Sequence, residues 1–231
     1  MLEEVTPTTK ELLKWWFSEE QCSIRKRNFH EGQRQAILNI IYLHEVAKIN
    51  TVTDTYDFVG EDLIARADLA TLAKAKYQIP KYAVKMATGT GKTWVMHAML
   101  LWQMLNARHE DEPSGRFTKN FLIVAPGLIV YDRLLDAFCG RIKRGTEYRD
   151  FDTNDFVLNQ DVFIPVHLRQ EVFSFIQNNV VTKEEGIGRK ATGDGMIALT
   201  NWHLFENQLA DDDQQEEGEV TVPQIIEQLL P

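Results

Sequence analysis

The segment MATGTGKT, residues 86–93, most constrains how this chain folds. It joins the short apolar run YAVKM to a long, strongly apolar segment. Gly91, Lys92 and Thr93 complete the pattern Gly-x-x-x-x-Gly-Lys-Ser/Thr of a phosphate-binding loop, while Met86 stands where that pattern has its first glycine. We expect Met86 to end a strand, where an extended backbone does not require glycine. Such a loop lies between a strand and a helix, so it predicts an α/β fold.

The residue types in this loop suit a phosphate chain. Glycines at 89 and 91 let successive backbone N–H groups turn toward phosphate oxygens, and the helix beginning near Lys92 directs its positive end at the same anion. Lys92 is expected to reach the β- and γ-phosphates as the catalytic residue, and the Thr93 hydroxyl is expected to bind Mg²⁺. The alternative is a glycine-rich turn without a ligand. The predicted ATP-binding residues of the loop are Thr88, Gly89, Thr90, Gly91, Lys92 and Thr93.

Hydrophobic periodicity predicts a helical N-terminal part followed by alternating strands and helices. Thr8 and Glu11 have the spacing of a capping box at the start of the first helix. Continuous apolar runs of strand length indicate a parallel sheet covered on both faces. Helices are expected over 6–17, 30–48, 60–77, 92–107, 128–138 and 168–178, and strands over 82–86, 121–126, 161–166 and 195–202.

A site that hydrolyses a nucleotide also needs a carboxylate at the end of a neighbouring strand. Two acidic clusters follow the loop, Asp111–Glu112 and Asp211–Asp213. The first has no apolar strand before it, and the segment before the second has a helical pattern. Both are therefore interpreted as solvated surface acids. The hydrolytic half of the site is not recognisable in the sequence.

Charge and cysteine content limit the setting in which the chain works. Its net charge of −9 argues against attraction of nucleic acid to the whole surface, although two local basic strips, 25–27 and 140–149, remain. Each strip taken alone is interpreted as solvated surface. Two cysteines, Cys22 and Cys139, are too few for a disulfide framework, and no apolar run approaches the roughly 18 residues of a membrane span. We expect a cytoplasmic protein without a membrane segment.

Three blocks in order resemble the opening of a superfamily 2 helicase or translocase. They are FHEGQRQAI at 29–37, MATGTGKT at 86–93 and FLIVAPGLIVYDRL at 121–134. Within that group the chain is most similar to the Res subunit of type III restriction enzymes. The resemblance implies a RecA-like P-loop domain, with a parallel sheet flanked by helices, that uses ATP and Mg²⁺ to move along DNA.

The resemblance also implies further site residues. Gln33 falls where these proteins place the glutamine that reads the adenine edge, and a carboxamide can both accept from and donate to that edge. Pro126 and Gly127 fall in the motif that touches the sugar-phosphate backbone of the nucleic acid. Thr200 and Asn201 are expected near the same track.

The same resemblance implies a larger assembly. Residues 1–80 are expected to form a helical segment carrying the adenine motif and an inserted helical stretch, and residues 81–231 are expected to form a truncated first RecA-like domain. Relatives carry an acidic motif and a second RecA-like domain with an arginine finger, neither recognisable here. We therefore expect the chain alone to hydrolyse ATP poorly. In the whole enzyme, translocation would support endonucleolytic cleavage with a DNA-methyltransferase (modification) subunit as partner.

Other functions remain open at the level of sequence. Within the superfamily, the chain could belong to the motor of a type I restriction enzyme or to a phage or plasmid helicase. Outside it, a stand-alone P-loop kinase would need an arginine-bearing lid, for which 140–149 is the candidate. A non-catalytic DNA-binding module would bind DNA independently of Lys92 and ATP.

Overall fold

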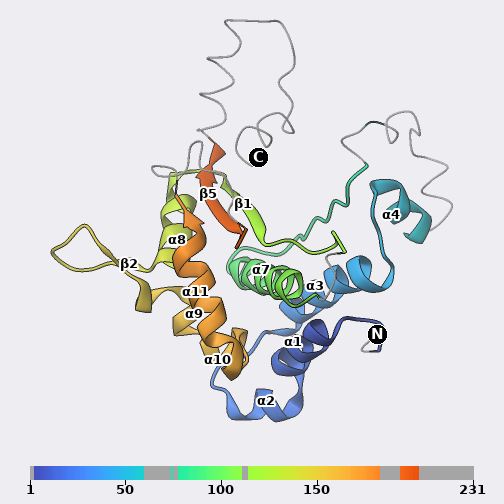
Figure 1. Ribbon diagram of the computed structural model, residues 1–231, viewed down its shortest axis with the longest axis horizontal. Coiled ribbons are helices and arrows are strands. Elements are labelled where there is room, and N and C mark those ends of the chain that lie inside the picture. The colour runs from blue at the N-terminus through green and yellow to red at the C-terminus, as the bar shows by residue number, and fades with distance from the viewer. Residues whose placement is uncertain (1–2, 60–73, 75–77, 111–113, 183–192, 203–231) are drawn as a thin grey trace, which may run out of the picture. The chain divides into compact units, whose positions relative to one another are not determined.

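The computed structural model describes residues 3–59, 74, 78–110, 114–182 and 193–202 (Figure 1). The chain divides into two compact units, Met1–Trp102 and Gln103–Pro231, and the boundary falls within one helix. The domain boundary expected at residue 80 stays a prediction. None of the helices in the described part of the chain is both long enough and apolar enough to cross a membrane.

The described part of the first unit is helical. Its elements are α1 (Pro7–Phe17), α2 (Glu19–Ile24), α3 (Glu31–Ile41), the π-helical turn η1 (Tyr42–Val46), α4 (Val52–Val59) and the first part of α7 (Lys92–His109). The helix expected over 30–48 is present as α3 continued by η1. The helix expected over 60–77 lies outside the described residues except for residue 74.

The cap of α1 differs from the sequence-based expectation. Thr6, rather than Thr8, is the N-cap, and its hydroxyl accepts from the Thr9 amide at 3.1 Å. Pro7 explains the difference because its fixed φ and missing N–H suit the first helical position, which sets the start of the helix one residue after Thr6. Thr8 therefore lies inside the helix, and the Thr8–Glu11 capping box is wrong.

A buried carboxylate links three segments of the first unit. Glu45, on η1, is only 6% exposed. It accepts hydrogen bonds from the Thr6 amide at 2.8 Å, the Thr9 hydroxyl at 2.5 Å and the Trp102 indole N–H at 2.7 Å. These bonds join the start of α1, the π-helical turn and α7 inside a core of large apolar side chains that includes Leu12, Trp16, Ile37, Ile41 and Leu101.

The second unit contains a parallel sheet in the order β1-β5-β4. Its strands are β1 (Asn120–Ala125), β4 (Val180–Val181) and β5 (Met196–Asn201). The helices α8 (Leu128–Cys139) and α11 (Arg169–Asn179) pack against this sheet. The strands expected over 121–126 and 195–202 and the helices expected over 92–107, 128–138 and 168–178 are confirmed.

Smaller elements complete the second unit. A short antiparallel hairpin pairs β2 (Arg141–Ile142) with β3 (Arg149–Asp150). After it come η3 (Phe151–Thr153), α9 (Asp155–Leu158), α10 (Gln160–Phe163) and η4 (Val166–Leu168). Phe138, Phe156 and Phe163 form part of the core of this unit.

Two expected strands are wrong. Residues 161–166 form the end of α10 and the start of η4, because Pro165 has no N–H for a sheet ladder and the apolar run Val162–Ile164 is buried by helical turns instead. Residues 82–86 form no strand. They belong to the first unit, whose described residues contain no strand, and an unpaired strand would leave its backbone groups without ladder partners.

Candidate nucleotide site and strand-edge residues

The loop 86–93 enters α7 through two glycines in left-handed conformations. Gly89 has φ 81° and Gly91 has φ 71°, a region that costs roughly 1–2 kcal/mol for a residue with a side chain. Helix α7 begins at Lys92, and the Trp94 amide donates to the Gly91 carbonyl at 2.9 Å. The helix expected after the loop is thus present, although the strand expected before it is not.

The predicted phosphate-binding groups lie at the surface. Lys92 and Thr93 are both exposed, as are Thr88 and Gly89. The Lys92 ammonium donates to the Ala87 carbonyl at 2.8 Å, within its own loop. An anion entering the loop would therefore compete with one carbonyl oxygen for this ammonium. The loop glycines, the lysine and the threonine form a set of groups that fits a phosphate chain with a divalent cation.

The structure brings Gln33 to this loop. The Gln33 side-chain amide donates to the Gly91 carbonyl at 3.2 Å, although the two residues are far apart in sequence. Gln33 is 4% exposed and its carbonyl oxygen accepts from the His30 amide at 3.0 Å. Both ends of the carboxamide are thus engaged. Gln33 can present them to an adenine edge only if it exchanges these two bonds.

His30 is a site residue that the sequence reasoning missed. Its Nδ1 accepts from the Gln33 amide at 3.3 Å and forms a capping box with Gln33 at the start of α3. Its Nε2 lies 2.8 Å from the Thr90 carbonyl. Because a carbonyl only accepts, Nε2 carries the hydrogen, and the same neutral tautomer leaves Nδ1 free to accept. The sequence signal was available, since His30 stands three residues before Gln33, at the position of a helix cap.

An aromatic cluster holds the start of α3 against α7. Phe29 packs edge-on against Trp94, with ring centroids 5.8 Å apart, and against Trp16 and Phe17 at 6.1 and 5.7 Å. Each such pair contributes about 0.5–1.5 kcal/mol beyond its buried area. Trp94 follows the loop directly, so this packing positions His30 and Gln33 beside it.

The four predicted nucleic-acid residues lie at one edge of the sheet. Strand β5 ends with Thr200 and Asn201, which pair in register with Val124 and Ala125 of β1, directly before Pro126 and Gly127. Thr200 and Asn201 are buried, at 5% and 0% exposed, whereas Pro126 is exposed. In this conformation only the β1 side of the edge presents these residues to a ligand.

The sequence model of the family described as type III restriction enzyme, res subunit, matches residues 26–220. The chain belongs to this family. Neither curated proteins nor solved structures gave a match to the chain. The matched region includes His30, Gln33, the loop and all three strands of the parallel sheet.

Membership of the Res family defines the class of the domain. It is a RecA-like, helicase-like ATPase domain, and the parallel sheet with flanking helices in the second unit agrees with that fold. Domains of this family typically use ATP, and restriction enzymes act on DNA. The resemblance seen in the sequence is confirmed.

The acidic partner of the Res-family loop is not located. Asp111–Glu112 and Asp211–Asp213 both lie outside the described residues. Within the described ranges, no group of three or more His, Cys, Asp or Glu side chains is placed to hold a metal ion. Thr93 is therefore the single predicted Mg²⁺ ligand that the structure places at the loop.

Proposed function

We propose that this chain is the ATP-binding part of a Res-subunit DNA helicase or translocase, acting in the cytoplasm. ATP would bind at residues 88–93 together with Gln33. In the whole enzyme, ATP-driven movement along DNA would support endonucleolytic cleavage, with a DNA-methyltransferase modification subunit as partner. Family membership over residues 26–220 and the geometry of the loop support this proposal.

One observation carries the proposal furthest: the Gln33 amide on the Gly91 carbonyl. A glycine-rich turn without a ligand would have no need of a buried glutamine from a distant helix. Here the predicted adenine-side residue and the predicted phosphate-side loop form a direct contact. This contact supports the proposal that Gln33 and the loop act together in one nucleotide site.

Each residue of the loop has a defined task in this proposal. Bound MgATP would supply the phosphoanhydride bond whose hydrolysis drives movement. Lys92 would leave the Ala87 carbonyl and place its positive charge beside the phosphates, and the Thr93 hydroxyl would orient the cation. Gly89 and Gly91 would keep backbone N–H groups turned toward the anion. Pro126 and Gly127 would touch the DNA backbone at the exposed edge of β1, near Thr200 and Asn201.

The test is ATP binding and hydrolysis by this chain, with and without DNA, beside Lys92→Ala. Lys85→Ala is a matched control because Lys85 is also exposed and precedes the loop. We expect Lys92→Ala to abolish ATP binding and Lys85→Ala to leave it unchanged. Equal binding by all three proteins would overturn the proposal.

The rate of ATP hydrolysis shows whether the chain contains the carboxylate and arginine that hydrolysis needs. We expect slow hydrolysis, because transition-state stabilisation requires a carboxylate and an arginine in addition to the loop. DNA-stimulated turnover that is lost in Lys92→Ala would instead assign the carboxylate to an acidic cluster, with Asp211–Asp213 as the first candidate. Transfer of phosphate to a small acceptor would favour the kinase alternative.

A further inference from the structure

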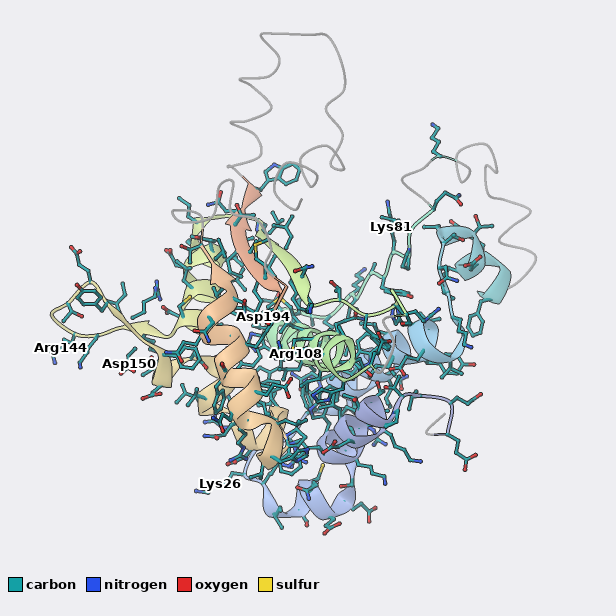
Figure 2. All side chains as sticks on the ribbon, viewed as in Figure 1. Lys26, Lys81, Arg108, Arg144, Asp150 and Asp194 are labelled. Carbon is teal, nitrogen blue, oxygen red and sulfur yellow. The ribbon has the colours of Figure 1, made fainter. Side chains whose placement is uncertain are left out.

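The β2–β3 hairpin is a basic and exposed feature of the second unit. Residues 140–150 contain four basic and two acidic side chains, a local net charge of +2 in a chain of net charge −9. Lys143 and Arg144 are exposed in its turn, and neither forms an ion pair within the described residues. The hairpin extends away from α8 and α11, with Arg144 near its tip (Figures 1 and 2).

The backbone of the hairpin has a defined shape, which fixes where its basic residues stand along the turn. At its base, the Arg149 guanidinium donates to Asp136 and to the Gly140 carbonyl, both at 2.7 Å. At its turn, the Lys143 amide donates to the Tyr148 carbonyl at 2.8 Å, and the Thr146 amide donates to the Lys143 carbonyl at 3.0 Å. A preformed site loses less entropy when it binds.

A cavity of about 410 Å³ opens beside this hairpin. It lies between the hairpin, α8 and α11, and its volume falls within the roughly 300–1,000 Å³ range of small-ligand pockets. Four aromatic side chains line it: Tyr131, Phe138, Tyr148 and Phe151. Tyr148 is 80% exposed, so most of this side chain remains open to a partner.

The charged residues around the cavity indicate where a base and where a phosphate would bind. Glu147 and Arg149 both line the cavity, and the Arg149 guanidinium is already bonded to Asp136 and to the Gly140 carbonyl. Lys143 and Arg144 stand outside the cavity in the exposed turn. An aromatic cavity beside a pair of cations suits a strand whose base enters the cavity while its phosphates meet the cations. Aromatic side chains bind unpaired bases by stacking, with little dependence on sequence.

We propose that the hairpin and its cavity bind single-stranded DNA: an unpaired base stacks on Tyr148, and the flanking phosphates contact Lys143 and Arg144. The choice of DNA as the partner rests on the proposed function. The site is separate from the predicted contacts at Pro126 and Gly127, and it requires neither ATP nor Lys92. A motor that binds DNA at this hairpin would have a second, sequence-independent contact with one strand.

The test measures the affinity of the whole chain for a fluorescein-labelled 20-nucleotide oligothymidylate by anisotropy, without ATP. We expect Lys143→Ala/Arg144→Ala to weaken binding and to lower the slope of log K against log salt by about 1.4, at about 0.7 per lost phosphate contact. Lys26→Ala/Arg27→Ala is the matched control, because it removes the same two charges from the other exposed strip. Equal loss in both double variants would overturn the proposal in favour of general electrostatics.

Stacking is tested at Tyr148. We expect Tyr148→Leu to weaken binding about 5- to 100-fold and Tyr148→Phe to retain it, since the stacked ring is kept. Equal affinities of the Leu and Phe variants would refute stacking. A duplex of matched length should bind less tightly and respond little to Tyr148→Leu. An equal loss of duplex affinity in Tyr148→Leu would refute stacking of Tyr148 on an unpaired base.

The two cysteines report where the base lies. Cys139 lines the cavity, whereas Cys22 belongs to the first unit. We expect the oligonucleotide to slow maleimide alkylation of Cys139 and to leave that of Cys22 unchanged. The absence of selective slowing would remove the base from the cavity.

The DNA measurement also separates this proposal from the proposed function. Absence of DNA binding by the wild-type chain, with Lys92-dependent ATP binding intact, would refute the hairpin site alone. Hairpin-dependent DNA binding without ATP binding would leave the hairpin standing and refute the nucleotide site.

Discussion

Gly91 is the residue on which local and tertiary requirements coincide. Its φ of 71° disfavours any side chain, and a Cβ there would collide with the Gln33 side-chain amide. Gly89 shares the positive φ but has open space around it. Comparing substitutions at the two glycines therefore distinguishes the effect of backbone strain from the effect of losing the contact with Gln33.

Gly91→Ala is expected to weaken ATP binding at least tenfold, because it displaces Gln33 as well as straining the loop. Gly89→Ala should cost only the strain, roughly 1–2 kcal/mol in the free energy of unfolding. Calorimetric ATP titration and urea unfolding of both variants check this. Equal loss of ATP affinity would show that the Gln33 contact does not contribute.

His30 is expected to support the loop through its bond to the Thr90 carbonyl. His30→Ala should lose both this bond and the helix cap, lowering the free energy of unfolding by about 0.5–2 kcal/mol. His30→Asn keeps a capping side chain and should lose only the loop contact. We expect both variants to weaken ATP binding, but only His30→Ala to lower stability clearly. Normal ATP affinity in His30→Asn would contradict a role of His30 in positioning the loop.

At the scale of elements, the π-helical turn η1 carries the buried side chain of Glu45. A π-helical turn inserted after α3 changes which side chains face inward, and here it buries a carboxylate among donors from α1 and α7. Such turns are rare and are retained where a specific side chain must be aimed. Glu45 therefore acts as the link between these helices.

Glu45→Ala is expected to lower the free energy of unfolding by about 1–3 kcal/mol, because the buried Thr9 hydroxyl loses its acceptor and the Trp102 indole N–H keeps only the Thr9 hydroxyl oxygen. Trp102→Phe is the comparison, since it removes one donor and leaves the carboxylate its other partners. Urea unfolding followed by circular dichroism measures both. A smaller effect of Glu45→Ala than of Trp102→Phe would contradict the linking role.

At the scale of the whole molecule, the first unit contains an acid-sensitive group. His97 lies in α7 and is fully buried, and burial lowers its pKa to about 3. In the unfolded chain it titrates near its ordinary value of about 6.5. Below that pH the unfolded chain takes up a proton that the folded chain refuses until about pH 3, so stability is full above pH 6.5 and falls as the pH drops toward 3.

His97→Leu is expected to remove this part of the acid sensitivity. The difference in unfolding free energy between the variant and the wild type should move in favour of the variant between pH 7 and pH 5, by at most about 1.4 kcal/mol per pH unit below 6.5. Urea unfolding at both pH values is the measurement. Parallel pH curves would show that His97 is not buried in its neutral form.

Elements built from strong, continuous patterns were predictable. The apolar run before Pro126 and the one ending at Asn201 became β1 and β5, and the long apolar segment after the loop became α7. The strand prediction for 161–166 failed because three apolar residues before a proline suit a buried helical turn as well as a strand. The run at 82–86 failed because a strand depends on a partner that its own sequence does not contain.

The order of residues along the chain was enough to identify the family and to predict a nucleotide-binding loop. The predicted phosphate-binding groups are neighbours along the chain, so their chemistry is local and can be read from residue order. Only the tertiary structure decided that His30 and Gln33 reach the carbonyls of Thr90 and Gly91, and that an aromatic cavity opens beside the basic hairpin. These contacts join residues distant in the chain, and such contacts form only when packing of the whole unit brings the segments together.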